Sequence, residues 1–301
     1  MNGIRLALSL LLVVLPAAAL PAVQKTRGPR AWAIVMAISL GAGFVLLEAS
    51  LIHAALPLVF GLMGLHDLAD ACRRLGGHLF GGSPLFSALA GVTSLLIIQS
   101  AARGVIRSVR MNSALRRGAV GGVEAAVAGH KAVLMPLSRA WAVALPGGLP
   151  QVLLSTSLVG TLEHRELDAV VRHEMAHLRH HHVRFLLLGT AVSSGLRFLP
   201  WSGRAMTSLR LALEEWADQA SAPTFEDRAN VRSALRKLAS MTPSALAGYR
   251  LNALEERDYV QRTGHEWGWP TAASATIPLV LGLTFTLVTH LVQVIEMAGA
   301  G

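Results

Sequence analysis

Charged residues are scarce in this chain. Only 15% of its 301 residues are Asp, Glu, Lys or Arg, whereas roughly 25% is usual in soluble globular proteins. Hydrophobic residues make up 52% and the mean hydropathy is +0.48. This composition excludes an intrinsically disordered protein, because such chains are poor in apolar residues. We therefore expect a mainly α membrane protein, much of which contacts the lipid bilayer.

Cysteine and acidic residues are also few. The single cysteine, Cys72, excludes a disulfide framework and any cysteine-rich metal module. The chain has 18 acidic residues against 27 Lys and Arg, which gives a formal net charge of +9. In a membrane protein an excess of Lys and Arg gathers in cytoplasmic loops. We take the charge as a sign of topology and expect no direct contact with nucleic acid.

Five apolar stretches approach the roughly 20 residues that a helix needs to cross a bilayer. They are Leu6–Val23, Ala31–Phe60, Leu85–Ala102, Phe185–Trp201 and Ser274–Val294. The first also has the features of a secretory signal peptide, but its apolar run is long for a signal core and further spans follow, which favours a retained span. The second contains Glu48 and His53, which are costly in lipid and are expected to be buried against other helices or to lie at the rim.

The distribution of charge between these stretches predicts their orientation. The loop with Lys25, Arg27 and Arg30 has no acid, and the arginine-rich stretch 103–117 precedes the first downstream acid, Glu124. Both segments are predicted to be cytoplasmic. We therefore divide the chain into a three-span membrane region (1–102), a cytoplasmic domain (103–272) and a C-terminal transmembrane helix (273–301), in a multi-pass protein of the cell membrane.

The cytoplasmic domain begins with strand-like segments and continues with a helix. The segments 131–137, 141–145 and 151–155 are typical of strands, with a Pro-Gly-Gly turn before the last, and predict a small antiparallel sheet. From Thr161 onward apolar residues recur at helical spacing, with Thr161 as the expected N-cap and Glu163 and Glu166 in the first turn.

The chemistry-bearing motif lies on this helix. In the sequence His-Glu-Met-Ala-His, His173 and His177 are one helical turn apart, so both imidazoles can bind one Zn²⁺ ion, and Glu174 lies beside them as a general base. A bound zinc polarises a peptide carbonyl and lowers the pKa of a bound water, which a carboxylate can then deprotonate. The spacing therefore predicts a zinc endopeptidase acting on a protein substrate. The three histidines that follow, His180 to His182, are expected to be solvated or interfacial, with an accessory metal site as the alternative.

A catalytic zinc generally has three protein ligands and an open position, so a third ligand must come from elsewhere. A second helical segment supplies acids: Glu214 is expected to reach the zinc and Asp218, one turn later, to hold a ligand histidine or an arginine. Glu215 points about 100° away and is the alternative ligand. The acids could also merely balance the charges of Arg204 and Arg210.

If His173 and Glu214 bind the same zinc ion, the number of times that the stretch at 185–201 can cross the bilayer is limited. A single crossing would place His173 and Glu214 on opposite sides of the bilayer. Two crossings need about 40 residues, whereas 36 separate His177 from Glu214. We therefore expect a buried or shallow membrane-associated helix there, and about four transmembrane helices in all.

These motifs resemble the integral-membrane zinc peptidases of the BlaR/MecR type, the antirepressor family whose best-known members sense penicillins. The similarity lies in the Pro-Gly-Gly turn and the segments 151–155, 162–166, 170–179 and 214–218. It implies a gluzincin-like α+β peptidase domain, with His173, His177 and Glu214 as ligands and Glu174 as the base. It also implies intramolecular or regulatory proteolysis at the cytoplasmic face, often of a small winged-helix repressor. Only a few residues follow the last apolar stretch, so the resemblance does not extend to penicillin sensing.

Two alternatives stay open. Membrane peptidases of the heat-shock and CAAX-processing type, which act in protein quality control, share the ligand pattern but usually have two crossings between the histidines and the glutamate. The other alternative is a non-catalytic membrane receptor or scaffold with a structural zinc, although such a site has four protein ligands and no need of Glu174. Arg250 and His265 are expected to be core-facing or interfacial, with assistance to an oxyanion as the alternative for His265.

Overall fold

The computed structural model describes residues 28–76, 83–147, 151–241 and 245–263. The expected first and last spans, Leu6–Val23 and Ser274–Val294, lie outside the described residues, as does His265. The described part is mostly helical, with one four-stranded sheet.

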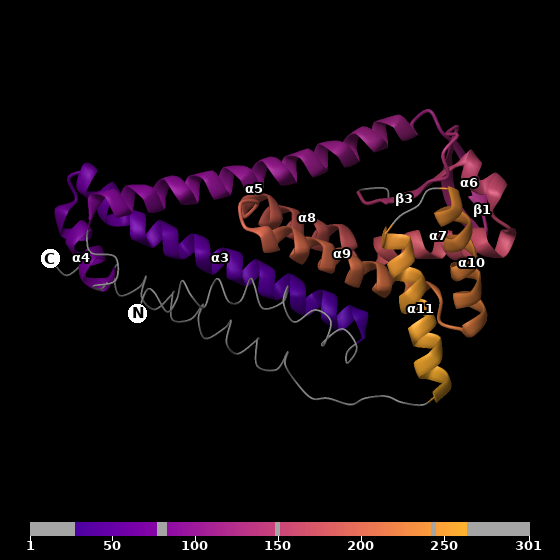
Figure 1. Ribbon diagram of the computed structural model, residues 1–301. Helices are drawn as coiled ribbons and strands as arrows, with labels where there is room; N and C mark the ends of the chain where they lie inside the picture. The colour runs from indigo at the N-terminus through magenta and orange to yellow at the C-terminus, as the bar shows by residue number, and fades with distance from the viewer. Residues whose placement is uncertain (1–27, 77–82, 148–150, 242–244, 264–301) are drawn as a thin grey trace.

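Two helices are long and apolar enough to cross a membrane, α3 (Pro29–Leu62) and α5 (Pro84–Ala119). They pack against each other, and the short α4 (His66–Gly76) lies between them in sequence (Figure 1). Glu48 of α3 is buried and accepts a hydrogen bond of 2.7 Å from the Ser94 hydroxyl of α5. The expectation that Glu48 is buried against another helix is thus confirmed. The outer surface of α5 exposes a set of large apolar side chains: Leu85, Leu89, Val92, Leu95 and Leu96.

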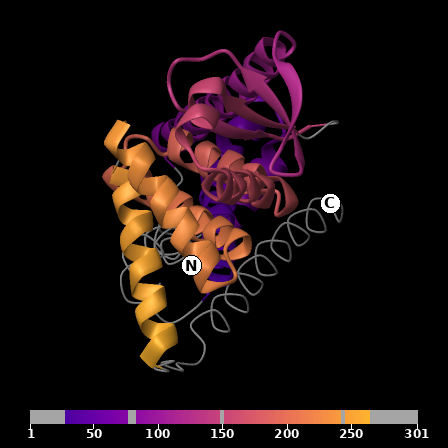
Figure 2. The ribbon, with the colours of Figure 1, turned by 90° about the vertical axis from the view of Figure 1, so that its right-hand side faces the viewer.

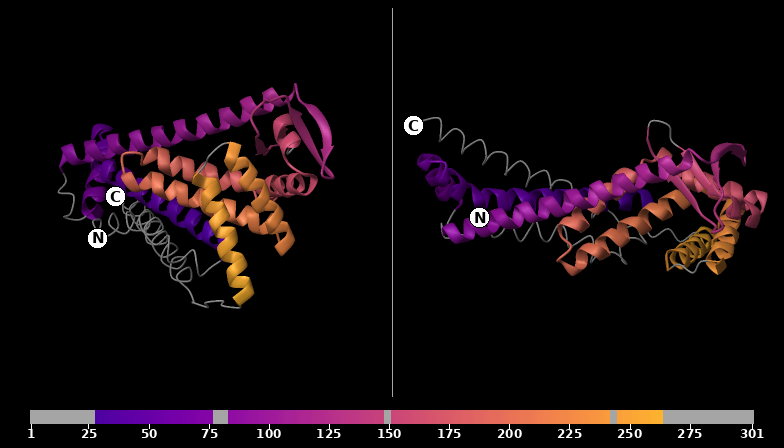
Figure 3. Two further views of the ribbon diagram at one scale, coloured as in Figure 1. Left: turned by 45° about the vertical axis from the view of Figure 1, so that its right-hand side comes forward. Right: turned by 90° about the horizontal axis from the view of Figure 1, so that it is seen from above.

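The helix α5 continues past residue 102 without a break and leads directly to the sheet. Figure 3 shows the sheet and α10 (Phe225–Met241) at one end of the two long helices. The strands are β1 (Val123–Val127), β2 (His130–Met135), β3 (Ala142–Leu145) and β4 (Gln151–Ser155), in the order β1-β2-β4-β3.

The prediction of a purely antiparallel sheet is wrong. The strands β2 and β4 pair in parallel, while β1 with β2 and β3 with β4 are antiparallel. The cause is that β3 pairs with the outer edge of β4 instead of lying between β2 and β4. The strand β1, which the sequence did not predict, joins β2 through a tight turn in which Ala128 and Gly129 both have positive φ. The strand β3 therefore forms one edge of the sheet.

A capping box starts the helix that carries the histidines, α7 (His164–Arg179). The side chain of Glu163 caps its N-terminus and Glu166 accepts a hydrogen bond from the Glu163 amide. Thr161 as the N-cap is wrong, because it is the last residue of the preceding helix α6 (Thr156–Thr161), where its hydroxyl donates to the Ser157 carbonyl. The apolar face of α7 packs on the sheet, where Leu167 and Val171 contribute to a buried cluster.

The stretch around 185–201 is two helices rather than one. The helix α8 (His182–Gly195) ends, the chain turns through Leu196–Leu199, and α9 (Pro200–Ser221) returns alongside it (Figure 1). The two helices approach closely at Gly189, where a Cβ would lie only 2.6 Å from the Met206 sulfur and 2.9 Å from Leu209. The single helix expected at 185–201 is thus corrected. The hairpin brings α9 back to α7.

The last two described helices complete the domain. They are α10, which packs against α7, and α11 (Ala245–Thr263), which lies alongside α10 in Figure 2 and also contacts α9. The Lys237 ammonium and the Ser233 hydroxyl of α10 donate to the buried Glu166 carboxylate at 2.7 and 2.5 Å. Glu166, which belongs to the capping box of α7, thereby also connects α7 to α10.

Candidate metal centre

The helices α7 and α9 bring His173, His177 and Glu214 together. The Nε2 atoms of the two histidines are 3.1 Å apart, and the Glu214 carboxylate oxygens lie 3.3 Å from His173 Nε2 and 3.7 Å from His177 Nε2. Ligands about 2.0–2.1 Å from a tetrahedral zinc are separated from one another by about 3.3 Å. The three side chains therefore have the donor types and the spacing that a zinc ion needs.

The other face of His173 contacts Asp218. Its Nδ1 lies 2.9 Å from Asp218 Oδ1, so a His173 that binds metal through Nε2 donates its Nδ1 proton to this carboxylate. Asp218 lies one turn after Glu214 on α9 and has only 3% of its side chain exposed. This is the orienting position that the sequence predicted for Asp218.

Arg250 of α11 is the site residue that the sequence analysis placed elsewhere. Its Nε and Nη2 atoms donate to the two oxygens of Asp218 at 2.9 and 2.6 Å, and its Nη1 lies 3.3 Å from Glu214. A single guanidinium thereby balances two carboxylates. The expected core-facing or interfacial place of Arg250 is wrong, because its guanidinium lies in this charged cluster with 14% of the side chain exposed. The helical segment of Arg250 also carries other Arg, Asp and Glu residues, so the sequence alone neither singles out Arg250 nor reveals its partners.

Glu215 points away from the histidines. Its carboxylate accepts a hydrogen bond of 2.6 Å from the Tyr249 hydroxyl of α11. The group that could hold a metal in the described residues comprises His173, His177 and Glu214, all within 4.8 Å of one another. The geometry therefore favours Glu214 over Glu215 as the third ligand.

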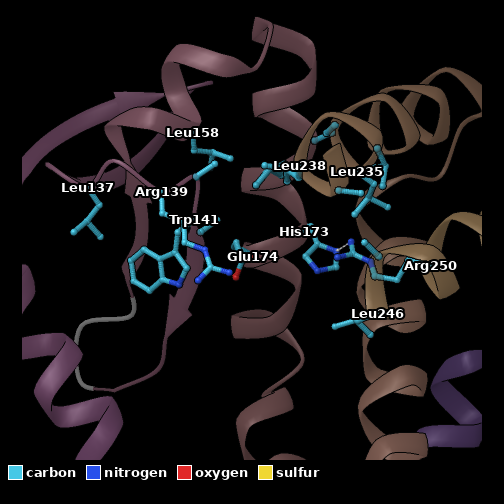
Figure 4. Close-up of a pocket in the computed structure, with 18 of the residues that line it drawn as sticks. Leu137, Arg139, Trp141, Leu158, His173, Glu174, Leu235, Leu238, Leu246 and Arg250 are labelled. Atoms are coloured by element: carbon cyan, nitrogen blue, oxygen red, sulfur yellow. Dashed lines mark hydrogen bonds between the residues drawn. The ribbon is translucent and has the colours of Figure 1, made fainter. Parts of the chain in front are cut away.

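Glu174 borders a cavity of about 730 Å³ next to the histidines. Figure 4 shows Glu174 on the side of α7 that faces Arg139 and Trp141, while His173 points toward Arg250. Most of the cavity wall is apolar, and α10 and α11 contribute Val231, Leu235, Leu238 and Leu246 to it. Burial raises the pKa of Glu174, and a hydrogen bond from the backbone of Ala144 on β3 opposes this shift.

Electrostatics set the charge states of the remaining groups. Burial alone would raise the pKa of Glu214, but the hydrogen bond and charge of His173, with the charge of Arg250, hold it at about 2. Burial and the His173 charge lower the pKa of His177 to about 3. Burial and Arg250 lower the pKa of His173, but the charge and hydrogen bond of Asp218 and the hydrogen bond of Glu214 outweigh them and raise it to about 9. Glu214 and His177 therefore have the protonation states of metal ligands, whereas His173 releases its proton on binding a metal.

The position of His182, one of the three histidines after the motif, differs from the prediction. His182 is 0% exposed and its Nδ1 lies 2.8 Å from His177 Nδ1, so the expectation of a solvated or interfacial side chain is wrong for this residue. The helix α7 ends at this point, where His181 adopts φ = 53°, and the His182 ring packs against Trp216 of α9. Burial and the charge of His180 lower the pKa of His182 to about 4.

Comparison with known proteins agrees with this centre. Residues 110–210 match the model of peptidase family M48, which includes the sheet, His173, Glu174 and His177. The chain is also similar to the plastoglobule-localized metallopeptidase 48, chloroplastic, of Arabidopsis thaliana, with 29% identity over 144 residues. That alignment covers 44% of this chain and 42% of the relative, so the chain spans less than half of the relative's length. No solved structure matches the chain. A peptidase M48 domain is therefore present, and the antirepressor family is not the one matched.

Proposed function

We propose that this chain, through its peptidase M48 domain, is a membrane-associated zinc endopeptidase. The observation that carries the proposal is the placement of His173, His177 and Glu214 within 4.8 Å of one another, with Glu174 between the two histidines in sequence. A zinc held by these three side chains would supply Lewis acidity and an acidified water. A three-residue site of this kind leaves a fourth position open, which favours catalysis over a structural role.

The chain's own residues take the remaining roles in this mechanism. Glu174 accepts the proton from the attacking water and delivers it to the leaving amine, as a general base and then a general acid. Asp218 orients His173 through Nδ1, and Arg250 fixes Asp218 through two hydrogen bonds. The Arg250 charge also offsets the cost of burying Asp218 and Glu214.

The edge strand β3 supplies a binding surface for an extended polypeptide. Its inner edge pairs with β4, whereas the Ala144 amide on the outer edge donates to Glu174. A substrate segment that adds to this outer edge would pass directly beside the catalytic carboxylate, as in other cases of strand addition to an open sheet edge. The substrate is therefore an extended segment of a protein.

The cavity beside Glu174 predicts which side chain the substrate presents. Leu235, Leu238 and Leu246 make its wall apolar, and Trp141 lies across from α10 (Figure 4). A charged substrate side chain would lose its hydrating water against this apolar wall, which costs free energy. We infer a preference for a large apolar residue next to the cleaved bond.

Removing the metal is expected to abolish proteolysis. The full chain, purified in detergent, is incubated with an unfolded protein such as casein, with and without a zinc chelator. Cleavage is expected only without chelator, is expected to return when Zn²⁺ is restored, and the cut sites mapped by mass spectrometry should be flanked by large apolar residues. Chelator-resistant cleavage, or no cleavage by a zinc-loaded sample, would contradict the proposal and favour the receptor or scaffold alternative.

We further propose that the catalytic domain faces the cytoplasm, because the arginine-rich stretch 103–117 forms the end of α5 that leads into the domain. About four crossings are needed if Leu6–Val23 and Ser274–Val294 also span the bilayer. A reporter fused after Arg117 is expected to behave as cytoplasmic in a topology assay. An external signal would reverse the orientation of the whole domain.

The finer substrate proposal is cleavage of a regulatory protein such as a winged-helix repressor, which the antirepressor resemblance implies. Quality control of damaged membrane proteins is the alternative. A Glu174→Gln chain used to trap substrates in cells discriminates the two, because a regulator would be recovered as one dominant species whereas quality control would yield many unrelated proteins.

A further inference from the structure

His182 contacts a proposed zinc ligand although it lies on a different helix. It is the first residue of α8, whereas His177 lies in the last turn of α7. The two Nδ1 atoms are 2.8 Å apart and the ring centroids 4.8 Å apart, in an edge-on arrangement. His181, which adopts a left-handed conformation with φ = 53°, separates the two helices at this point. A non-glycine residue in this conformation is uncommon and costs free energy.

The contact fixes where the protons of both rings lie. His177 Nε2 faces His173 and Glu214, so this nitrogen must be free of its proton to bind a metal. The proton of a neutral His177 then lies on Nδ1, which donates to His182 Nδ1. His182 must accept through Nδ1 and carry its own proton on Nε2. That Nε2 is buried without a hydrogen-bond partner in the described part of the chain.

The packing around His182 also connects it to the third ligand. The ring centroid of His182 lies 4.6 Å from that of Trp216, which follows Glu214 by two residues on α9. Phe185 of α8 contacts both rings from the side. His182 is therefore held between the second histidine of the motif and the helix that carries Glu214. It does not belong to the group that could hold the metal itself.

We propose that His182 is a positioning residue of the metal centre: its Nδ1 accepts the His177 Nδ1 proton and so fixes the tautomer and ring orientation in which His177 binds zinc through Nε2. This inference rests on the zinc site proposed above. Partners of ligating histidines are usually carboxylates or backbone carbonyls. A buried neutral imidazole does the same without adding a negative charge, which suits a site where Glu214 and Asp218 already share a single Arg250.

Two substitutions separate the hydrogen bond from the packing. His182→Leu keeps an apolar side chain against Trp216 but removes the acceptor, whereas His182→Asn retains an acceptor oxygen at the position of Nδ1. We expect His182→Leu to bind zinc about 10- to 100-fold more weakly in a chelator competition, and His182→Asn to lose less than about tenfold. The matched control is His180→Leu, because His180 also stacks on Trp216, with centroids 4.9 Å apart, and should leave zinc affinity unchanged.

The outcomes are decisive in each direction. Parent-like zinc affinity of His182→Leu would overturn the proposal, and so would an equal loss in His182→Asn, since packing alone would then explain the effect. The thermal stability of the metal-free variants shows whether they fold. Should His182→Leu not fold, nitrogen NMR of the zinc-loaded parent with labelled histidine decides: protons on His177 Nδ1 and His182 Nε2 are expected, and a proton on His182 Nδ1 would overturn the assignment. A parent that binds no zinc would instead contradict the proposed function.

Discussion

Replacing Glu174 with Gln is expected to abolish proteolysis and to leave zinc bound. The glutamine side chain has nearly the same shape and can still accept the hydrogen bond from the Ala144 backbone, but it cannot take a proton from water. General acid–base catalysis by a positioned side chain contributes about 10²- to 10⁴-fold, so the rate of casein cleavage should fall by at least about 100-fold. Glu174 is not among the three residues that could hold the metal, so zinc content should match the parent.

The matched control is Glu226→Gln. Glu226 lies on α10, has 70% of its side chain exposed and pairs with Arg165 far from the cavity. An exposed pair of this kind contributes little to stability, so the control should cleave casein at the parent rate. Full activity in a zinc-loaded Glu174→Gln chain would remove Glu174 from the mechanism.

The second large effect is expected from the acids of α9. Glu214→Ala removes one of three metal ligands, so the zinc content of the purified chain should fall to near zero. Asp218→Ala removes only the acceptor of the His173 Nδ1 proton, and such a loss typically weakens zinc affinity by about 10- to 100-fold. Glu215→Ala should keep the parent's zinc, because the Glu215 carboxylate accepts a hydrogen bond from Tyr249 and lies outside the group that could hold the metal.

Metal analysis and chelator competition on the three variants test this order. Thermal unfolding of the metal-free proteins controls for misfolding, which matters most for Asp218→Ala, since it leaves the buried Arg250 without its main partner. If Glu215→Ala alone emptied the site, the faces of α9 would be assigned one residue out of register and Glu215 would be the ligand.

The parts of the site that the sequence predicts depend on helical spacing. His173 and His177 lie on one face of α7 because they are one turn apart, and the same spacing places Glu214 and Asp218 on one face of α9. The limited chain length between His177 and Glu214 also predicts that the two segments meet without a full crossing between them, and the α8–α9 hairpin brings them together.

Contacts between distant segments could not be predicted in this way. The parallel pairing of β2 with β4 depends on where β3 lies, and local patterns of alternation do not show this. Arg250 reaches Asp218 across 32 residues of sequence, and its helix shows nothing that points to the site. A run of histidines at a helix end predicts a solvated or interfacial position for His182, whereas its ring packs against Trp216 after the left-handed His181.

The central claim is that His173, His177 and Glu214 bind a catalytic zinc ion. The most direct measurement is X-ray absorption spectroscopy at the zinc edge, combined with metal analysis, on the purified full chain. The account predicts one zinc per chain, with imidazole nitrogens and carboxylate oxygen at about 2.0–2.2 Å and no sulfur ligand. A chain that takes up no zinc, or a zinc whose spectrum persists unchanged after both His173 and His177 are replaced by alanine, would contradict it.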